Sequence, residues 1–232
     1  MHSDPMALPE ARGGQNPAWR LPWRGILVGY LAAILTGAAY ALAVHSSGWW
    51  TGGAWEREML LFIHRPIPAV LDRLLLIVPW LGTNISLAPA LALAAFVLWR
   101  RGRTDLALRL VVVETGSLTL NLVLKALFER TRPDLWPKRG QWDLASFPSG
   151  HMIASLAVLF TIAIVLRAER GWRWPFVAAG VLLTVSLYSR LYLGVHWPTD
   201  VLGGLAVGLT WLAATHLAWQ PQATASTVER QQ

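Results

Sequence analysis

Long apolar runs alternate with short polar segments along the 232 residues of the chain. Six of the runs are long enough to cross a bilayer, whose hydrocarbon core of about 30 Å needs roughly 20 helical residues per crossing. We expect these spans at residues 25–44, 82–99, 106–128, 149–166, 174–192 and 198–219. The pattern therefore predicts an all-α fold, a polytopic membrane bundle of six transmembrane helices.

The segments outside the predicted spans differ in character. Residues 45–81 mix apolar stretches with charged residues and tryptophans, which is typical of amphipathic helices that lie at a membrane interface. Residues 1–24 and 220–232 are polar. The expected organisation is a disordered cytoplasmic tail over 1–24, one membrane domain over 25–219 and a polar C-terminal tail over 220–232.

Composition favours the bilayer as the surroundings of this chain. Hydrophobic residues make up 54% of it, charged residues only 14%, and the mean hydropathy is +0.42, which is too apolar for an ordinary soluble domain. The net charge of +7 comes from basic residues that stand between apolar runs. Because they form no continuous basic face, lipid head groups are the expected partner and nucleic acid is not. The absence of cysteine excludes a disulfide, a thiolate metal site and a cysteine nucleophile.

Three polar segments interrupt the apolar pattern, and the six-span layout places all of them at one membrane face. The first runs from Lys125, at the end of the third span, to Arg132. The second, residues 148–151, opens the fourth span, and the third, residues 189–200, leads into the sixth. Helix bundles build their sites from side chains that converge in this way.

These segments contain the residue types that phosphoryl transfer needs, namely cations for the phosphate oxygens, a nucleophile and a proton donor. Lys125, Arg132 and Arg190 can supply the positive charge. Ser149 and Gly150 stand directly before an apolar helix, and the backbone N–H groups at a helix N-terminus bind anions.

Two histidines fit the remaining roles. His196 and Asp200 are four residues apart around the start of a helix, so the carboxylate could reach one imidazole nitrogen and leave the other as nucleophile. His151 remains as the general acid, since an imidazole with a pKa near neutrality can protonate a leaving oxygen. Taken singly, each residue has a simpler explanation as a lipid anchor, a helix cap or a packing residue. Only their joint occurrence indicates a site.

In order and spacing, the three segments resemble the signature of the type 2 phosphatidic acid phosphatase superfamily of membrane lipid phosphatases. The matching positions are Lys125 with Arg132 and Pro133, then Pro148, Ser149, Gly150 and His151, then Ser189 and Arg190 with His196 and Asp200. The resemblance implies a phosphohistidine intermediate on His196, protonation of the leaving group by His151 and orientation by Asp200. It also implies phosphate binding by Lys125, Arg132, Ser149, Gly150 and Arg190, with no metal and no cofactor.

The resemblance extends to bacterial undecaprenyl-diphosphate and phosphatidylglycerophosphate phosphatases, so the expected activity is metal-independent hydrolysis of a lipid phosphate or diphosphate. Undecaprenyl diphosphate is the first expected substrate, and three further cations near the site, Arg130, Lys138 and Arg139, favour a diphosphate. Phosphatidylglycerophosphate and phosphatidic acid are alternatives. Phosphotransfer to another lipid and a non-catalytic lipid-phosphate binding or flipping protein also stay open, as does the oligomeric state.

Arginines indicate the orientation of the predicted bundle. Both connections after the second and fourth spans are rich in them: Arg100, Arg101, Arg103, Arg167, Arg170 and Arg173. Because basic loops stay in the cytoplasm, we expect both termini there, in the inner (plasma) membrane, with the site facing the periplasm or cell exterior.

One further pattern lies inside the third predicted span. Glu114, Ser117, Asn121 and Lys125 recur at helical spacing, so they share one face, which we expect to point into the bundle. The favoured interpretation is a buried hydrogen-bonded network that fixes helix packing, and the alternative is a polar track leading to the site.

Overall fold

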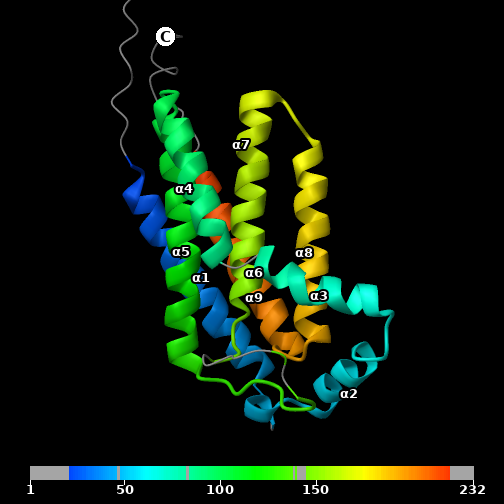
Figure 1. Cartoon of the computed structure of the whole chain (residues 1–232). Helices are drawn as coiled ribbons and strands as arrows, with labels where there is room; N and C mark the ends of the chain where they lie inside the picture. The colour runs from blue at the N-terminus through cyan, green and yellow to red at the C-terminus, as the bar shows by residue number, and fades with distance from the viewer. Residues whose placement is uncertain (1–20, 46–47, 82–83, 138, 140–144, 220–232) are drawn as a thin grey trace, which may run out of the picture.

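The computed structural model describes residues 21–45, 48–81, 84–137, 139 and 145–219. Nearly all of the predicted tails over 1–24 and 220–232 lie outside the described residues, so their organisation stays a prediction. Every regular element of the described residues is a helix, which confirms the all-α fold (Figure 1).

The helices follow one another from the first span to the last. They are α1 (Trp23–Val44), the short 3₁₀ helix η1 (Trp49–Thr51), α2 (Ala54–Ile63), α3 (Ala69–Leu81), α4 (Asn84–Arg100), α5 (Thr104–Phe128), α6 (Gly150–Ala154), the π-helical turn η2 (Ser155–Leu159), α7 (Phe160–Arg170), α8 (Trp174–Tyr192) and α9 (Pro198–Ala218). Together, α6, η2 and α7 form one continuous helical segment.

Five helical segments of the described chain are long and apolar enough to cross a membrane, namely Trp23–Val44, Thr104–Phe128, Gly150–Arg170, Trp174–Tyr192 and Pro198–Ala218. They correspond to five of the six predicted spans. The remaining one, expected at 82–99, corresponds to α4, which has 17 residues. At 1.5 Å per residue these rise about 25 Å, less than the hydrocarbon core of about 30 Å. The count of six spans is therefore not confirmed, although α4 runs antiparallel to α5 and packs along it (Figure 1).

The first and last described helices pack side by side through small residues. The buried positions of α1 are Gly29, Ala33, Gly37 and Ala41, spaced four apart on one face. A Cβ on Gly29 would lie 2.4 Å from the Cβ of Ala214, so glycine is what lets α1 and α9 approach this closely. Figure 1 shows that the start of α1 and the end of α9 lie at the same end of the bundle.

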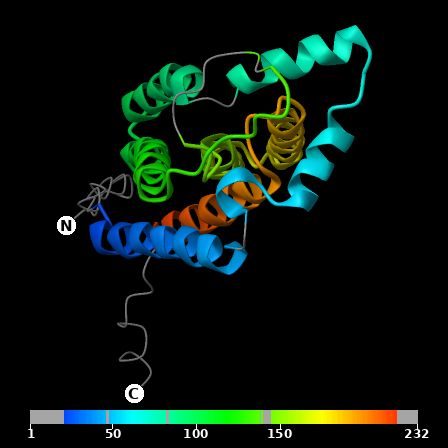
Figure 2. The same cartoon turned by 90° about the horizontal axis from the view of Figure 1, so that it is seen from below.

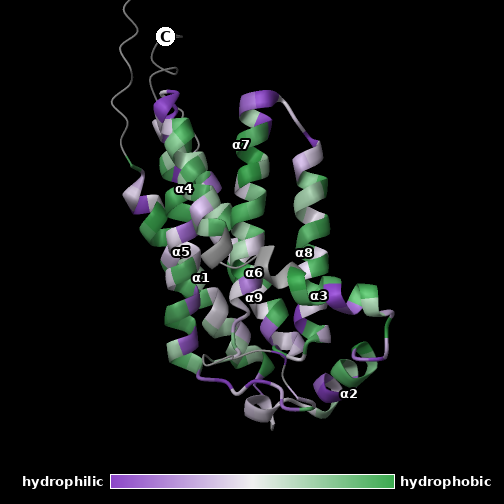
Figure 3. Ribbon diagram, in the orientation of Figure 1, coloured by the Kyte–Doolittle hydropathy of each residue, from purple (hydrophilic) through white to green (hydrophobic). Residues whose placement is uncertain are grey.

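Apolar residues make up most of the length of the long helices (Figure 3). Leu27, Val28 and Leu35 of α1 are exposed, as expected for a surface that faces lipid. Inside the bundle, Trp211 of α9 is buried, and its indole N–H donates a hydrogen bond to the carbonyl of Val113 at 3.1 Å. Polar residues gather at the helix ends and in the connection that follows α5.

Residues between α1 and α4 form short helices, as the sequence predicted. Both α2 and α3 lie across the bundle and contact α8 (Figures 1 and 2). In α3, Leu71, Leu74 and Ile77 are exposed while Leu75 is buried. The hydroxyl of Ser189 in α8 donates to the carbonyl of Leu75 at 2.8 Å, so α3 is fastened next to the third polar segment.

The polar face of α5 points into the bundle, as predicted, since Glu114, Ser117 and Lys125 are all buried. The favoured interpretation of that face was wrong in one respect. Ser117 donates to the carbonyl of Val113 in its own helix at 2.7 Å, and neither carboxylate oxygen of Glu114 has a hydrogen-bond partner among the described residues. A serine that bonds back to its own helix has no donor left for a neighbouring helix, so the expected network between helices does not form there.

Candidate functional site

All three polar segments of the sequence meet at one end of the bundle, drawn at the bottom of Figure 1. Each key side chain lies where a helix begins or ends. Lys125 is in the last turn of α5, His151 in the first turn of α6, Arg190 in the last turn of α8 and Asp200 in the first turn of α9. The convergence that the predicted layout required is thus present in the structure.

Direct hydrogen bonds join the first segment to the third. One guanidinium nitrogen of Arg132, Nη1, donates to the carbonyl of Val195 at 2.6 Å, directly before His196 in the sequence. The other, Nη2, donates to the carbonyl of Ala145 at 3.4 Å, and Lys125 Nζ donates to the same carbonyl. Arg132 is therefore held against the third segment, and Lys125 shares the carbonyl of Ala145 with it.

The second segment carries the start of a long helix to the same place. Ser149 is the N-cap residue of α6, and its backbone N–H donates to the carbonyl of Asp200 at 3.0 Å. Its side-chain hydroxyl is fully buried and has no hydrogen-bond partner among the described residues. A Cβ on Gly150 would lie 2.6 Å from the side chain of Asn121, so the close approach of α6 to α5 requires glycine here. A helix start with a small residue and an unpaired hydroxyl among the described residues is suited to binding an anion.

The third segment completes the group with Arg190 and His196. Arg190 is fully buried, and its Nη1 lies 3.3 Å from Nε2 of His151, so it connects the third segment to the second. His196 is also buried, with 2% of its surface exposed. Its Nδ1 lies 3.6 Å from Oδ2 of Asp200, which is slightly longer than a hydrogen bond. The carboxylate thus lies on the Nδ1 side of the imidazole, and Nε2 lies on the other side.

Electrostatics favour the neutral form of this imidazole. Burial, followed by the positive charges of Arg132, Lys125 and Arg190, holds the pKa of His196 well below its usual value. Burial also lowers the pKa of Arg132, which still remains a cation at neutral pH. A neutral histidine among cations can act as a nucleophile toward an anionic group.

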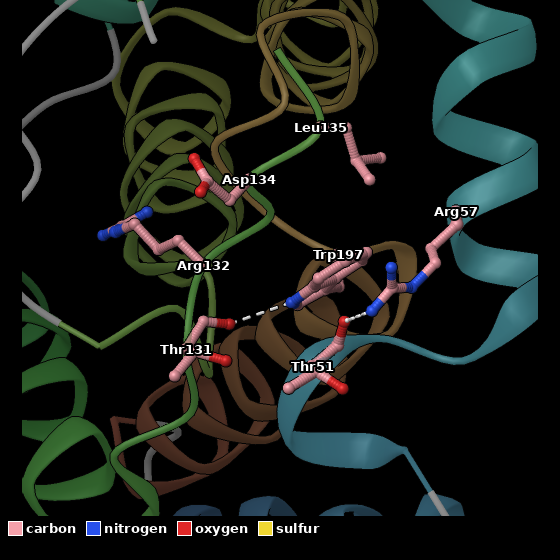
Figure 4. Close-up of a pocket in the computed structure, with 7 residues that line it drawn as sticks. All are labelled: Thr51, Arg57, Thr131, Arg132, Asp134, Leu135 and Trp197. Carbon is pink, nitrogen blue, oxygen red and sulfur yellow. Dashed lines mark hydrogen bonds between the residues drawn. The ribbon is translucent and has the colours of Figure 1, made fainter. Parts of the chain in front are cut away.

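A cavity of about 260 Å³ opens beside these residues (Figure 4). Its walls come from η1, α2, the connection after α5 and the start of α9: Thr51, Arg57, Thr131, Arg132, Asp134, Leu135 and Trp197. Trp197 is the neighbour of His196 in the sequence, and its indole N–H donates to the carbonyl of Thr131 at 2.9 Å. The cavity is therefore lined by both charged and apolar side chains, and it reaches the residue next to the predicted nucleophile.

Asp200 is hydrogen-bonded to Arg130 and, through it, linked to Thr199 and Glu56; the sequence suggested another role for Arg130 and did not single out the other two. Arg130 is fully buried and its Nη1 donates to Oδ1 of Asp200 at 2.6 Å and to the hydroxyl of Thr199 at 2.6 Å. Its Nη2 donates to Glu56 of α2 at 2.8 Å. A signal for Glu56 was present, because an acidic residue three positions after a glycine can cap the helix that begins there. Nothing in the sequence indicated that its partner would come from the far side of α5.

The structure corrects the use that the sequence suggested for the extra cations. Arg130 binds two carboxylates of the protein itself, and Arg139 binds Asp72 at 2.7 and 2.8 Å. The positive charges of both arginines are thus paired with carboxylates of the protein itself. Lys138 lies outside the described residues. Arg130 and Arg139 therefore do not favour a diphosphate substrate, and that prediction was wrong.

Comparison with known proteins gives a consistent result. The model of the PAP2 superfamily matches residues 106–223, half of the chain. Phosphatidylglycerophosphatase B of Bacillus subtilis is 38% identical over 135 residues, which cover 56% of this chain and 66% of that protein. An undecaprenyl-diphosphatase of the same organism is 31% identical over 130 residues, covering 52% and 63%. The chain therefore spans just under two thirds of the length of these two relatives.

A solved structure resembles the fold over most of its length. A transmembrane PAP2-type phosphatidylglycerolphosphate phosphatase from Bacillus subtilis matches with a TM-score of 0.70 and 27% sequence identity. The match covers 81% of this chain and 94% of that one. The similarity thus extends over most of the chain and is not limited to its polar end.

Proposed function

The chain belongs to the PAP2 superfamily, and on that premise we propose that it hydrolyses a lipid phosphate or diphosphate at the end of the bundle that holds His196. The observation that carries the proposal is the buried pair of His196 and Asp200. Burial and then the nearby cations Arg132, Lys125 and Arg190 lower the pKa of this histidine. An anion, a nucleophile and a proton donor would meet there.

In the proposed reaction, Nε2 of His196 attacks phosphorus, and the bond from phosphorus to the leaving oxygen breaks. His151 donates a proton to that oxygen, and the phosphoryl group stays on His196. His151 then takes a proton from water, which attacks the phosphohistidine and releases phosphate. Arg190 lies 3.3 Å from Nε2 of His151, and its movement toward a bound phosphate would free that nitrogen to carry the proton.

The remaining polar residues would stabilise the charge that develops on the phosphoryl oxygens. Lys125, Arg132 and Arg190 supply three positive charges, and Ser149 and Gly150 supply a helix N-terminus. Asp200 would fix the tautomer of His196 and stabilise the positive charge that forms when the imidazole is phosphorylated. Because three cations already neutralise the phosphate, the proposed reaction uses no metal ion and no cofactor.

A simple inhibition experiment tests this chemistry. Activity should persist in EDTA, and vanadate should inhibit because it can adopt the five-coordinate geometry of the transition state on His196. Loss of activity in EDTA that magnesium restores would contradict the metal-independent mechanism. His196→Ala provides the background rate for both measurements.

We propose that the substrate is a long-chain lipid that reaches the site sideways from the membrane. Lys125, His151 and Arg190 all lie at the ends of membrane-spanning helices, at the depth where lipid head groups reside. Lateral diffusion keeps the lipid tail in hydrocarbon, whereas passage through water would expose methylene groups at about 0.8 kcal/mol each. The site would face the periplasm or cell exterior, with both termini in the cytoplasm.

Undecaprenyl diphosphate is the first candidate substrate and phosphatidylglycerophosphate the second, since the chain is similar to proteins named for each activity. Purified protein in liposomes should be compared on undecaprenyl diphosphate, phosphatidylglycerophosphate, phosphatidic acid and glycerol phosphate. The proposal expects the first two to release phosphate fastest and glycerol phosphate to be slowest. Faster turnover of glycerol phosphate would contradict lateral access, and faster turnover of phosphatidic acid would contradict the order of substrates.

The main alternative is a protein that binds or flips lipid phosphates without cleaving them. Binding needs only the cations, whereas this site also holds a buried histidine and carboxylate that face each other. Phosphate release by wild-type protein that is absent from His196→Ala distinguishes the two functions. Adding a lipid alcohol as acceptor to the same assay would reveal phosphotransfer as a phosphorylated product.

A further inference from the structure

Arg130 stands two residues before Arg132 in the sequence, yet it has a different environment. It does not line the cavity beside His196, and none of its surface is exposed. Its guanidinium approaches Oδ1 of Asp200, whereas His196 faces Oδ2 of the same carboxylate. Arg130 therefore contacts the oxygen that is not offered to the imidazole.

All three nitrogens of this guanidinium have partners. Nη1 donates to Asp200 and to the hydroxyl of Thr199, both at 2.6 Å, and Nη2 donates to Oε2 of Glu56 at 2.8 Å. Nε donates to the carbonyl of Trp49 at 2.7 Å, and the guanidinium carbon lies 3.7 Å from the centre of the Trp49 ring. Such a set of contacts fixes both the position and the plane of the side chain.

Glu56 is held equally firmly. Its Oε1 accepts hydrogen bonds from the hydroxyl of Thr199 at 2.6 Å and from the N–H of Thr199 at 3.2 Å. Its Oε2 accepts from the N–H of Gly53 at 3.1 Å, at the start of α2. Only 3% of Glu56 is exposed, so a charge that costs much to bury is kept here by Arg130.

We propose that Arg130, anchored by Glu56, is the positioning residue that holds the carboxylate of Asp200 toward His196. This inference rests on the proposed function, because it assigns Asp200 the task of orienting the nucleophile. The carboxylate accepts a hydrogen bond from Arg130 on Oδ1, one from the backbone N–H of Trp197 on Oδ2 at 2.8 Å, and one from the side chain of Ser146. Arg130 is the charged donor among these three, so its loss would leave the plane of the carboxylate less firmly held.

The proposal gives the segment between α1 and α4 a part in the reaction. Glu56 belongs to α2 and Trp49 to η1, so both partners of Arg130 outside the polar segments come from this interfacial region. The region would support catalysis through one guanidinium, without any contact with substrate.

The test compares Arg130→Gln, Arg130→Lys and Glu56→Gln with Glu58→Gln, an exposed glutamate on the same helix. We expect kcat to fall about 10- to 100-fold in Arg130→Gln, the range typical of residues that orient a catalytic ligand, while KM stays within about twofold. Arg130→Lys keeps the charge but not the planar fork, so it should recover only part of kcat. Glu58→Gln should match wild type.

The pH profile separates positioning from a merely structural role. Without Arg130 the His196 and Asp200 pair faces no cation on the Oδ1 side, so it takes up a proton at higher pH. The acid limb of kcat/KM should therefore shift upward in Arg130→Gln, and not in Arg130→Lys, which keeps the charge, nor in Glu58→Gln. A variant that is merely less stable would lose active protein with an unchanged limb.

Two outcomes would overturn the inference: wild-type kcat in a folded Arg130→Gln, or a fall in kcat with the acid limb in place. If Arg130→Gln does not fold, Arg130→Lys and Glu56→Gln decide by kcat alone, and wild-type kcat in both folded variants would overturn the inference. His196→Ala, measured in parallel, distinguishes failure of the proposed function from failure of this inference. Its activity would refute the proposed function, whereas an inactive His196→Ala beside fully active Arg130 variants would refute only this inference.

Discussion

Two arginine–carboxylate clusters connect the chain after α5 to the interfacial region between α1 and α4. The inner cluster joins Arg130 to Glu56 and Asp200, and the outer one joins Arg139 to Asp72. Their distances are nearly the same, 2.6 and 2.8 Å in the inner cluster and 2.7 Å in the outer. Their surroundings are not: the side chain of Arg130 is 0% exposed and that of Arg139 is 49% exposed.

The difference shows that burial, rather than contact distance, decides what an ion pair does. Water screens the outer pair, so its removal changes little. The inner pair has no water to replace a lost partner, so removal of one member leaves a charge stranded inside the protein. Through Asp200 the inner cluster lies next to the proposed nucleophile. In the outer cluster, Asp72 instead accepts a hydrogen bond from the hydroxyl of Tyr192 at 2.9 Å.

The largest expected effect concerns the carboxylate that both the inner cluster and His196 share. Asp200→Asn should lower kcat about 10³- to 10⁴-fold and change KM little, because it removes the charge that orients and stabilises the imidazole. Steady-state phosphate release measures this, with His196→Ala as the lower limit. Wild-type turnover in Asp200→Asn would show that the inner cluster has no role in catalysis.

The second prediction concerns stability. Glu56→Ala should cost about 3–5 kcal/mol, because it leaves Arg130 buried without its second carboxylate. Thermal unfolding in detergent should show a clear fall in the midpoint, while Glu58→Ala on the exposed face of α2 should show almost none. Equal midpoints for the two variants would mean that the inner cluster is no more important to the fold than a surface charge.

The third prediction uses pH. Because the pKa of His196 lies well below its usual value, the imidazole should stay neutral, and the acid limb of kcat/KM should lie below about pH 6.5. The sign for stability is the same: the unfolded chain takes up a proton near that pH and the folded one does not, so stability is lost as the pH falls. An acid limb at or above the ordinary pKa of histidine would contradict the burial of His196 among cations.

The smallest effect is expected at the outer cluster. Hydrogen bonds from Arg139, and then from Tyr192, lower the pKa of Asp72. Its contribution to stability is present above the unfolded value of about 3.9 and is lost as the pH falls through the folded value. Because water screens this exposed pair, the contribution at pH 7 is small, so Asp72→Asn should leave turnover and the unfolding midpoint nearly unchanged, and added salt should remove any residual difference. A large loss on this substitution would show that exposure does not separate the two clusters.

Hydrophobic periodicity predicted most of the fold. Runs of about 20 apolar residues allow little besides membrane helices, and five of the six expected spans are present among the described residues. The exception, α4, shows the limit of the approach. Residues 82–99 are apolar enough for a span, but the helix has only 17 residues, and where a helix begins depends on local contacts that an average over a window cannot resolve.

The candidate site was predictable where its residues lie at helix ends. Fixed spacing along the chain, as between His196 and Asp200, translates into fixed spacing on a helix. Arg130 was misassigned because its partners are far away in sequence. Glu56 precedes it by 74 positions and Asp200 follows by 70, and spacing says nothing about pairs so distant. For the same reason, the pattern on α5 predicted which way Glu114 points but not what it would find there.

The close packing of α1 against α9 has a consequence for biosynthesis. A ribosome makes α1 first and α9 last among the described helices, and at about 5–20 residues per second the interval between them is on the order of ten seconds. Pairs that are neighbours in sequence, such as α4 with α5, can associate during that interval. The stripe that contains Gly29 cannot, because its partner Ala214 does not yet exist. Asp200 arrives on the same late helix, so a nascent chain remains without its carboxylate until translation has closed the bundle.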